Sequence, residues 1–65
     1  MKLMINGEWQ TFASDQALAS ILDSIGAKPP YAIAVNQTFV PRSQYQTLTM
    51  NDGDAIEIVQ AMAGG

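Results

Sequence analysis

The chain has 65 residues, of which 48% are hydrophobic and 14% charged, and its formal net charge is -3. A chain this short forms one domain and buries only about 60% of the surface that its unfolded form exposes, which excludes a deep catalytic cleft. Three basic residues are too few to hold nucleic acid tightly, and the apolar stretches are far shorter than the ~20 residues that cross a bilayer. We therefore expect a cytoplasmic protein that binds neither nucleic acid nor a membrane.

Cysteine and histidine are both absent. Their absence removes the usual zinc ligands, the usual general base and the commonest covalent nucleophile. The serines have no histidine to activate them; they are Ser14, Ser20, Ser24 and Ser43. The sequence therefore predicts a protein that is not itself an enzyme and has neither a metal site nor a cofactor of its own.

The first predicted element is a β-hairpin, with strands at residues 2–5 and 8–12 around the step Asn6-Gly7. This dipeptide suits a two-residue turn, because both central positions need a positive φ. Met4 should then pair with Trp9 on one face of the hairpin. The other face, assigned to the core, carries Leu3, Ile5 and Phe12.

A helix is predicted next, starting at Ser14, whose hydroxyl can cap the first turn, beside Asp15 at the positive end of the helix dipole. Apolar residues follow at three- and four-residue spacing, which predicts one buried stripe. Gly26 should end the helix after about three turns, because glycine adopts the left-handed conformation readily. The stripe consists of Leu18, Ile21, Leu22 and Ile25.

Pro29-Pro30 prevents continuation of the helix and returns the chain as an extended segment. A buried strand is predicted at residues 31–35, a turn at 36–38, a short strand at 39–40 that Pro41 ends, and one helical turn within 42–46.

The last predicted strand covers residues 55–60, with Ile56 and Ile58 on one face. Before it, Asn51-Asp52-Gly53-Asp54 has the composition of a turn. Asp52 and Asp54 could in principle hold a cation, but the spacing lacks the alternating ligands and terminal glutamate of a calcium loop. The turn interpretation is therefore preferred.

The helix has a single apolar stripe, so it must pack on one face of a sheet. The right-handed crossover rule makes the first strand parallel to a later one. An α+β fold of the ubiquitin-like β-grasp type satisfies both conditions, with a mixed sheet in the order 2-1-5-3-4 packed on one helix. Residues 1–60 would form this domain, and its central last strand would lead into a flexible diglycine tail at residues 61–65.

The chain ends Ala63-Gly64-Gly65. At a glycine frequency of ~7%, two final glycines arise by chance in roughly one chain in two hundred. The C-terminal carboxylate is ionised at neutral pH, with a pKa of ~3.5, and is a poor electrophile. Adenylation by ATP would activate it, and an attacking sulfur would displace AMP and leave a thiocarboxylate. Glycine lets a thin backbone enter a narrow active site, so Gly65 is predicted to react and Gly64 and Ala63 to enter the partner.

Trp9, Met4 and Tyr45 could form a docking spot, but in so small a domain they are interpreted mainly as shielding a thin core. Arg42 is interpreted as a solvated charge beside the end of a strand.

The sequence resembles the thiamine-biosynthesis sulfur carrier family over nearly its whole length. The resemblance rests on Met1 to Asn6, Ala34-Val35-Asn36-Gln37, Val40-Pro41-Arg42, Asp52-Gly53-Asp54 with Ile56, and Ala63-Gly64-Gly65. It implies that an E1-like adenylyltransferase, using ATP and Mg²⁺, adenylates Gly65. A sulfur-donating desulfurase system would then supply sulfur derived from cysteine, and thiazole synthase would accept it from the thiocarboxylate.

Three alternatives remain open at this point. The small subunit of molybdopterin synthase looks like the same fold with the same chemistry, although that family tends to be longer and to carry prolines before its glycines. A ubiquitin-like modifier would share the adenylation step. A plain interaction module would have no terminal chemistry.

Overall fold

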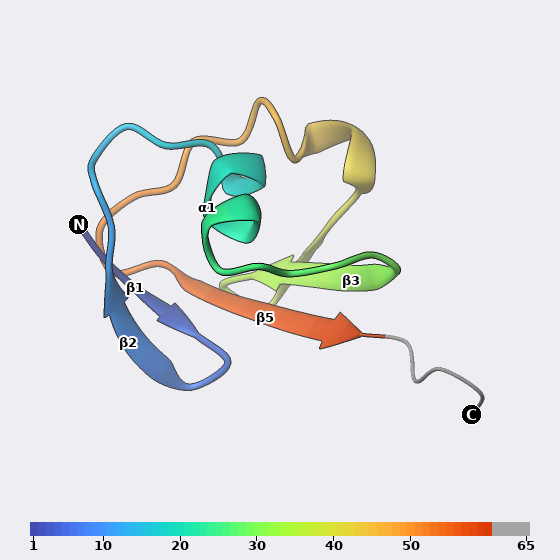
Figure 1. Cartoon of the computed structure of the whole chain (residues 1–65), viewed down its shortest axis with the longest axis horizontal. Helices are drawn as coiled ribbons and strands as arrows, with labels where there is room; N and C mark the ends of the chain where they lie inside the picture. The colour runs from blue at the N-terminus through green and yellow to red at the C-terminus, as the bar shows by residue number, and fades with distance from the viewer. Residues whose placement is uncertain (61–65) are drawn as a thin grey trace.

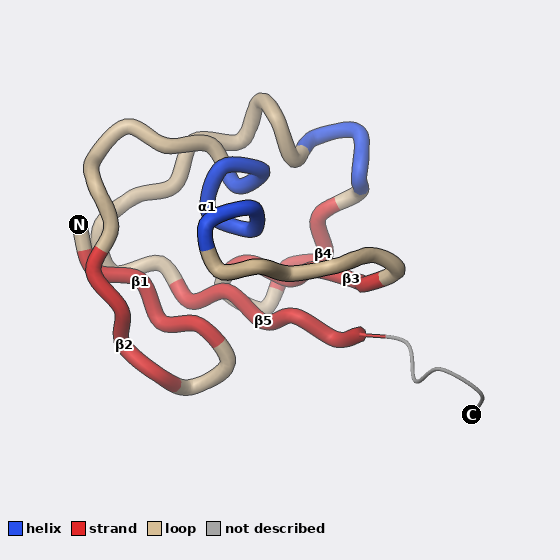
Figure 2. The backbone as a smooth tube through the Cα atoms, viewed as in Figure 1, coloured by secondary structure: helices blue, strands red, loops and turns tan. Residues whose placement is uncertain are grey.

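The computed structural model describes residues 1–60 and shows an α+β domain (Figure 1). Its elements, which Figure 2 colours by type, are β1 (Lys2–Ile5), β2 (Glu8–Thr11), α1 (Leu18–Ser24), β3 (Tyr31–Val35), β4 (Thr38–Val40), the 3-10 helix η1 (Arg42–Gln44) and β5 (Ala55–Gln60). No helix in this range is both long enough and apolar enough to span a bilayer.

The five strands form one mixed sheet in the order β2-β1-β5-β3-β4, which confirms the predicted topology. β1 and β5 run parallel, whereas β2 is antiparallel to β1 and β3 is antiparallel to both β4 and β5. The parallel pair requires a crossover, and the chain makes it through α1 on one face of the sheet (Figure 1). β5 therefore lies at the centre of the sheet, although it is the last strand along the chain.

Both hairpins close through two residues with positive φ. Asn6 and Gly7 have φ values of 48° and 85°, and Asn36 and Gln37 have 50° and 67°. Such turns match the twist of the paired strands. The first hairpin has the predicted register, with Met4 opposite Trp9. In the second, the assignment of Thr38 to the turn is wrong, because two residues suffice to reverse the chain and Thr38 already pairs in β4.

The helix is shorter than predicted, and its start at Ser14 is wrong. Its N-cap is Ala17, without a side-chain cap, and its seven residues make about two turns. Asp15 has a φ of 61°, outside the helical region. The amide of Leu18 donates to the carbonyl of Leu48, and Gln16 accepts from Met50. Pairing with residues 48–50 therefore holds this segment extended where local propensity favours a helix.

The end of α1 agrees with the prediction. Gly26 has a φ of 75°, and its amide donates to the carbonyl of Asp23. The amide of Ala27 donates to the carbonyl of Leu22. These two bonds are those of a Schellman motif, which needs a left-handed residue at this position.

The core lies between α1 and the face of the sheet that the helix covers. Seven residues of the helix stripe and of the inward faces of β1, β3 and β5 are at most 6% exposed, and buried residues of the segment 40–50 pack against them. The buried residues are Leu3, Ile5, Leu18, Ile21, Leu22, Ile33, Val40, Tyr45, Met50 and Ile56, with Phe12, Ile25 and Ile58 partly buried against them. The predicted inward faces are therefore confirmed.

We predict that Ile33→Val lowers the free energy of unfolding by about 1 kcal/mol, because it removes a methylene from a filled core. Phe39→Val should cost less than about 0.5 kcal/mol, although it removes far more atoms, because Phe39 is 67% exposed. Denaturant unfolding of both variants tests this contrast. A larger loss for Phe39→Val would show that this ring packs against something in solution.

Candidate functional site

The predicted site residues Gly65, Gly64 and Ala63, and the tail 61–65 to which they belong, lie outside the described residues. The structure describes the strand that leads to them and the surfaces around its end.

β5 is paired along both of its edges. On one side it runs antiparallel to β3, from Ile56 opposite Val35 to Gln60 opposite Tyr31. On the other it runs parallel to β1 over Ala55 and Ile56 only, so the last residues of β5 are paired with β3 alone. The side-chain amide of Gln60 also donates to the carbonyl of Lys28 at 2.9 Å. The backbone is thus held up to Gln60, the last described residue.

Two turn asparagines bind the backbone of this same strand. The Asn6 side chain accepts from the amide of Ile58 at 2.7 Å and donates to its carbonyl at 3.3 Å. The Asn36 side chain accepts from the amide of Ala55 at 2.9 Å and donates to the Asp54 carboxylate at 2.9 Å. Each hairpin therefore anchors β5 from its own turn, in addition to the strand pairing.

Asp52 and Asp54 act as turn residues, as predicted. The Asp52 carboxylate accepts from the amide of Lys2 at 2.6 Å. The second oxygen of Asp54 accepts from the amide of Asn51 at 2.8 Å. Both carboxylates are thus engaged with backbone amides, and residues 1–60 contain no cluster of three or more acidic side chains that could hold a metal ion.

The face of the sheet turned away from α1 exposes three large apolar side chains, together with Glu57 of β5. Trp9 is 57% exposed, and Phe39 and Val59 are each 67% exposed. The pairing places Trp9 beside Met4 and sets Phe39 and Val59 beside small alanines of β3. The interpretation of Trp9 as core shielding is therefore wrong, because its position in the hairpin points it away from the helix. For Tyr45, which is 8% exposed, that interpretation is confirmed.

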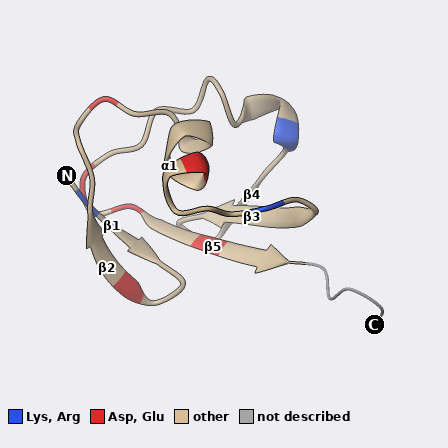
Figure 3. Cartoon of the chain, in the orientation of Figure 1, with Lys and Arg blue, Asp and Glu red and all other residues tan. Residues whose placement is uncertain are grey.

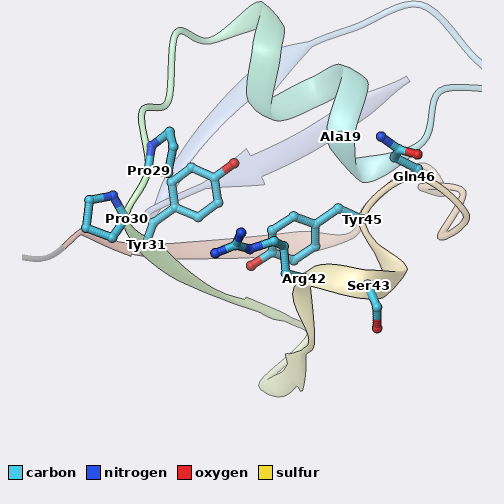
Figure 4. A pocket seen from close by; sticks show the side chains of 8 residues that line it. All are labelled: Ala19, Pro29, Pro30, Tyr31, Arg42, Ser43, Tyr45 and Gln46. Carbon is cyan, nitrogen blue, oxygen red and sulfur yellow. The ribbon is translucent and has the colours of Figure 1, made fainter.

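On the helix side, a groove of about 420 Å³ lies between η1 and the segment that precedes β3. Figure 4 shows Arg42 and the two tyrosines on the walls of this groove, with the Arg42 guanidinium on the side of Tyr45 towards Tyr31. The centroids of the Tyr31 and Tyr45 rings are 5.9 Å apart at an interplanar angle of 32°. The groove is lined by Ala19, Pro29, Pro30, Tyr31, Arg42, Ser43, Tyr45 and Gln46.

Arg42 influences the chemistry of this groove. Burial raises the pKa of the Tyr45 hydroxyl above its ordinary value, and the neighbouring Tyr31 adds to the increase, whereas the positive charge of Arg42 lowers that pKa. The interpretation of Arg42 as a simple solvated charge is therefore incomplete, since its guanidinium is exposed yet close enough to act on a buried phenol.

The sequence model of the ThiS family matches residues 3–65 and so spans both the domain and the terminal glycines. The chain belongs to the ThiS family. It is 32% identical to the "Sulfur carrier protein ThiS" of Escherichia coli, and the match covers all of both chains. It is 38% identical over its whole length to a "Thiazole synthase" of Paramagnetospirillum magneticum, of which it spans 20%.

Solved ThiS structures share the fold. A crystal structure of the thiamine biosynthesis protein ThiS from Geobacter metallireducens matches all of both chains with a TM-score of 0.85 at 26% identity. An NMR structure of the protein from that organism gives a TM-score of 0.84, with 88% of that chain covered. These matches confirm the ubiquitin-like β-grasp fold of this ThiS chain.

Sequence reasoning missed the role of the turn asparagines and the groove around Arg42. Asn6 and Asn36 occupy equivalent places in two predicted hairpins, and this equivalence could have indicated that they share a role. Their partners in β5 are up to 52 residues away, so no local pattern indicates the bonds. The groove likewise joins residues from three separate segments.

The adjacent turn residues Asn36 and Gln37 offer a matched test of the anchoring. Both have positive φ, so a change to glycine is tolerated by the backbone at either position. We predict that Asn36→Gly costs about 1 kcal/mol of stability, because it removes the bonds to Ala55 and Asp54. Gln37→Gly should not destabilise, because it creates the favoured Asn-Gly turn. Thermal and denaturant unfolding measure both, and equal effects would contradict the anchoring role.

Proposed function

We propose that this ThiS chain carries sulfur for the thiazole part of thiamine, with the α-carboxylate of Gly65 as the carrying group. The observation that supports this most directly is the family match through residue 65, together with a domain that holds the strand leading to the tail at the centre of its sheet. The two named relatives concern a sulfur carrier and thiazole synthase.

The chemistry proceeds in two steps. First, a carboxylate oxygen of Gly65 attacks the α-phosphorus of ATP and releases pyrophosphate, which gives an acyl-adenylate. A sulfur nucleophile at the oxidation level of sulfide then attacks the carbonyl carbon. AMP leaves with the bridging oxygen, and the product is a thiocarboxylate. Adenylation is required because an ionised carboxylate resists nucleophilic attack.

The chain acts as a co-substrate in this scheme, and its partners supply the catalytic groups. An E1-like adenylyltransferase with ATP and Mg²⁺ performs the first step, a desulfurase system provides the sulfur, and thiazole synthase receives it. The role of the domain is to position the terminus for these enzymes. Five residues follow Gln60, and an extended segment of that length reaches ~16 Å, enough to enter an active site while the domain stays outside.

The terminal position of the carboxylate can be tested directly. We predict that appending one residue after Gly65 abolishes adenylation by the E1-like enzyme, because the reacting carboxylate is displaced from its place in the active site. Mass spectrometry of protein from the producing cell should show one terminal oxygen of Gly65 replaced by sulfur in the natural chain, and no replacement in the extended one.

An N-terminal extension of equal length is the control, since it changes the mass but not the tail. Circular dichroism should show the same fold for all three chains. Sulfur at the terminus of the extended chain would overturn the proposal. A series of heavier conjugates on lysines of other proteins would point to a protein modifier, and loss of molybdenum-enzyme activity on gene deletion would point to the molybdopterin pathway.

A further inference from the structure

The groove around Arg42 has no part in the carrier chemistry described so far. In this groove a fully ionised side chain and two aromatic rings line the same hollow, together with the hydroxyl of Ser43 and the amide of Gln46. Such a site offers a charged donor and flat apolar walls together.

The charges of the chain are segregated around this groove. Residues 24–51 contain Lys28 and Arg42 and no acidic residue, whereas the rest of the chain contains one basic residue and six acidic ones. In Figure 3 the blue segments lie near the N-terminus, on η1 and on the connection before β3, and the red ones lie on α1, β2, β5 and the remaining loops. Asp23 lines the adjoining hollow, which shares Tyr31 and Tyr45 with the groove, so the positive charge of the groove comes from Arg42 on its η1 side.

That place adjoins the exit of the tail. Tyr31 lines the groove and pairs with Gln60, the last residue of β5. Gln60 is also bonded to the carbonyl of Lys28, just before the prolines of the groove wall. An enzyme that receives the chain beyond Gln60 must therefore lie next to the groove.

The chemistry of the groove favours a carboxylate. An arginine guanidinium binds a carboxylate through two parallel hydrogen bonds, and the neighbouring aromatic rings reduce the screening of that pair by water. A cationic side chain would be repelled by both Arg42 and Lys28. The matching group on a protein partner is an aspartate or glutamate at the rim of the opening that admits the tail.

We propose that the groove of Arg42, Tyr31 and Tyr45 binds an acidic side chain of thiazole synthase. This rests on the proposed function. The choice of partner is supported by the relative from Paramagnetospirillum magneticum, which is named a thiazole synthase and includes a segment 38% identical to this chain within a much longer polypeptide. A carrier domain in the same polypeptide as the synthase can contact the surface of the synthase.

The test measures binding of the full-length chain to purified thiazole synthase from the same cell by titration calorimetry. Arg42→Gln keeps an extended polar side chain and removes the charge, and it should weaken binding at least about tenfold. Arg42→Lys should give an intermediate loss, because it keeps the charge without the two-pronged donor.

Lys2→Gln is the matched control. It removes the same charge at the opposite end of the sheet, since Lys2 begins β1, which runs parallel to β5, and it should leave binding within about twofold. Added salt should weaken binding of the natural chain more than that of the Arg42→Gln variant. Arg42 is exposed, so the variants should fold, and their unfolding midpoints check this.

Equal binding by Arg42→Gln and Lys2→Gln would overturn the proposed site, as would absence of binding by the natural chain. Mass spectrometry of Gly65 in the same preparations separates this from the carrier function. If Gly65 carries sulfur but binding does not depend on Arg42, the proposed groove is rejected and the carrier function stands. Arg42-dependent binding by a chain that never acquires sulfur supports the groove and rejects the carrier function.

Discussion

The pairing of β5 between β1 and β3 is the constraint on which the rest of the molecule depends. A strand with neighbours on both sides cannot shift without breaking two sets of backbone hydrogen bonds, and its inward residues Ile56 and Ile58 pack under α1. A one-residue slip would turn those residues away from the core. The start of β5 is therefore held on both edges, and its end is held by β3 and by the side-chain bond of Gln60 to the Lys28 carbonyl.

The two hairpins contribute more than strand pairing to this arrangement. Asn6 and Asn36 adopt the left-handed conformation that asparagine tolerates better than most residues, and each uses its side chain to bind β5. Each asparagine thus provides the positive φ that its turn requires and also links the turn to the central strand. This dual use explains how a 65-residue chain without disulfides secures a parallel strand pair, which forms late because its partners are distant in sequence.

The two surfaces at the sheet differ in character, and both extend to the end of β5. The uncovered face exposes the apolar side chains of Trp9, Phe39 and Val59, and the groove on the helix side is aromatic and positively charged through Arg42. A partner that surrounds the exit of the tail can contact either surface. Binding at either surface would bring a partner next to Val59 or Gln60 at the end of β5.

The amino-acid sequence was enough to predict the order of the elements, the strand pairing of the first hairpin and the end of α1 at Gly26, because turns and glycine caps depend on residues close together in the chain. Its composition also pointed to the terminal glycines. The start of α1 depends instead on long-range contacts, since pairing between Ala17 and Thr49 overrides the local signal at Ser14. The same holds for the asparagine bonds to β5 and for the groove of Arg42, because each joins residues that become neighbours only when the sheet has formed.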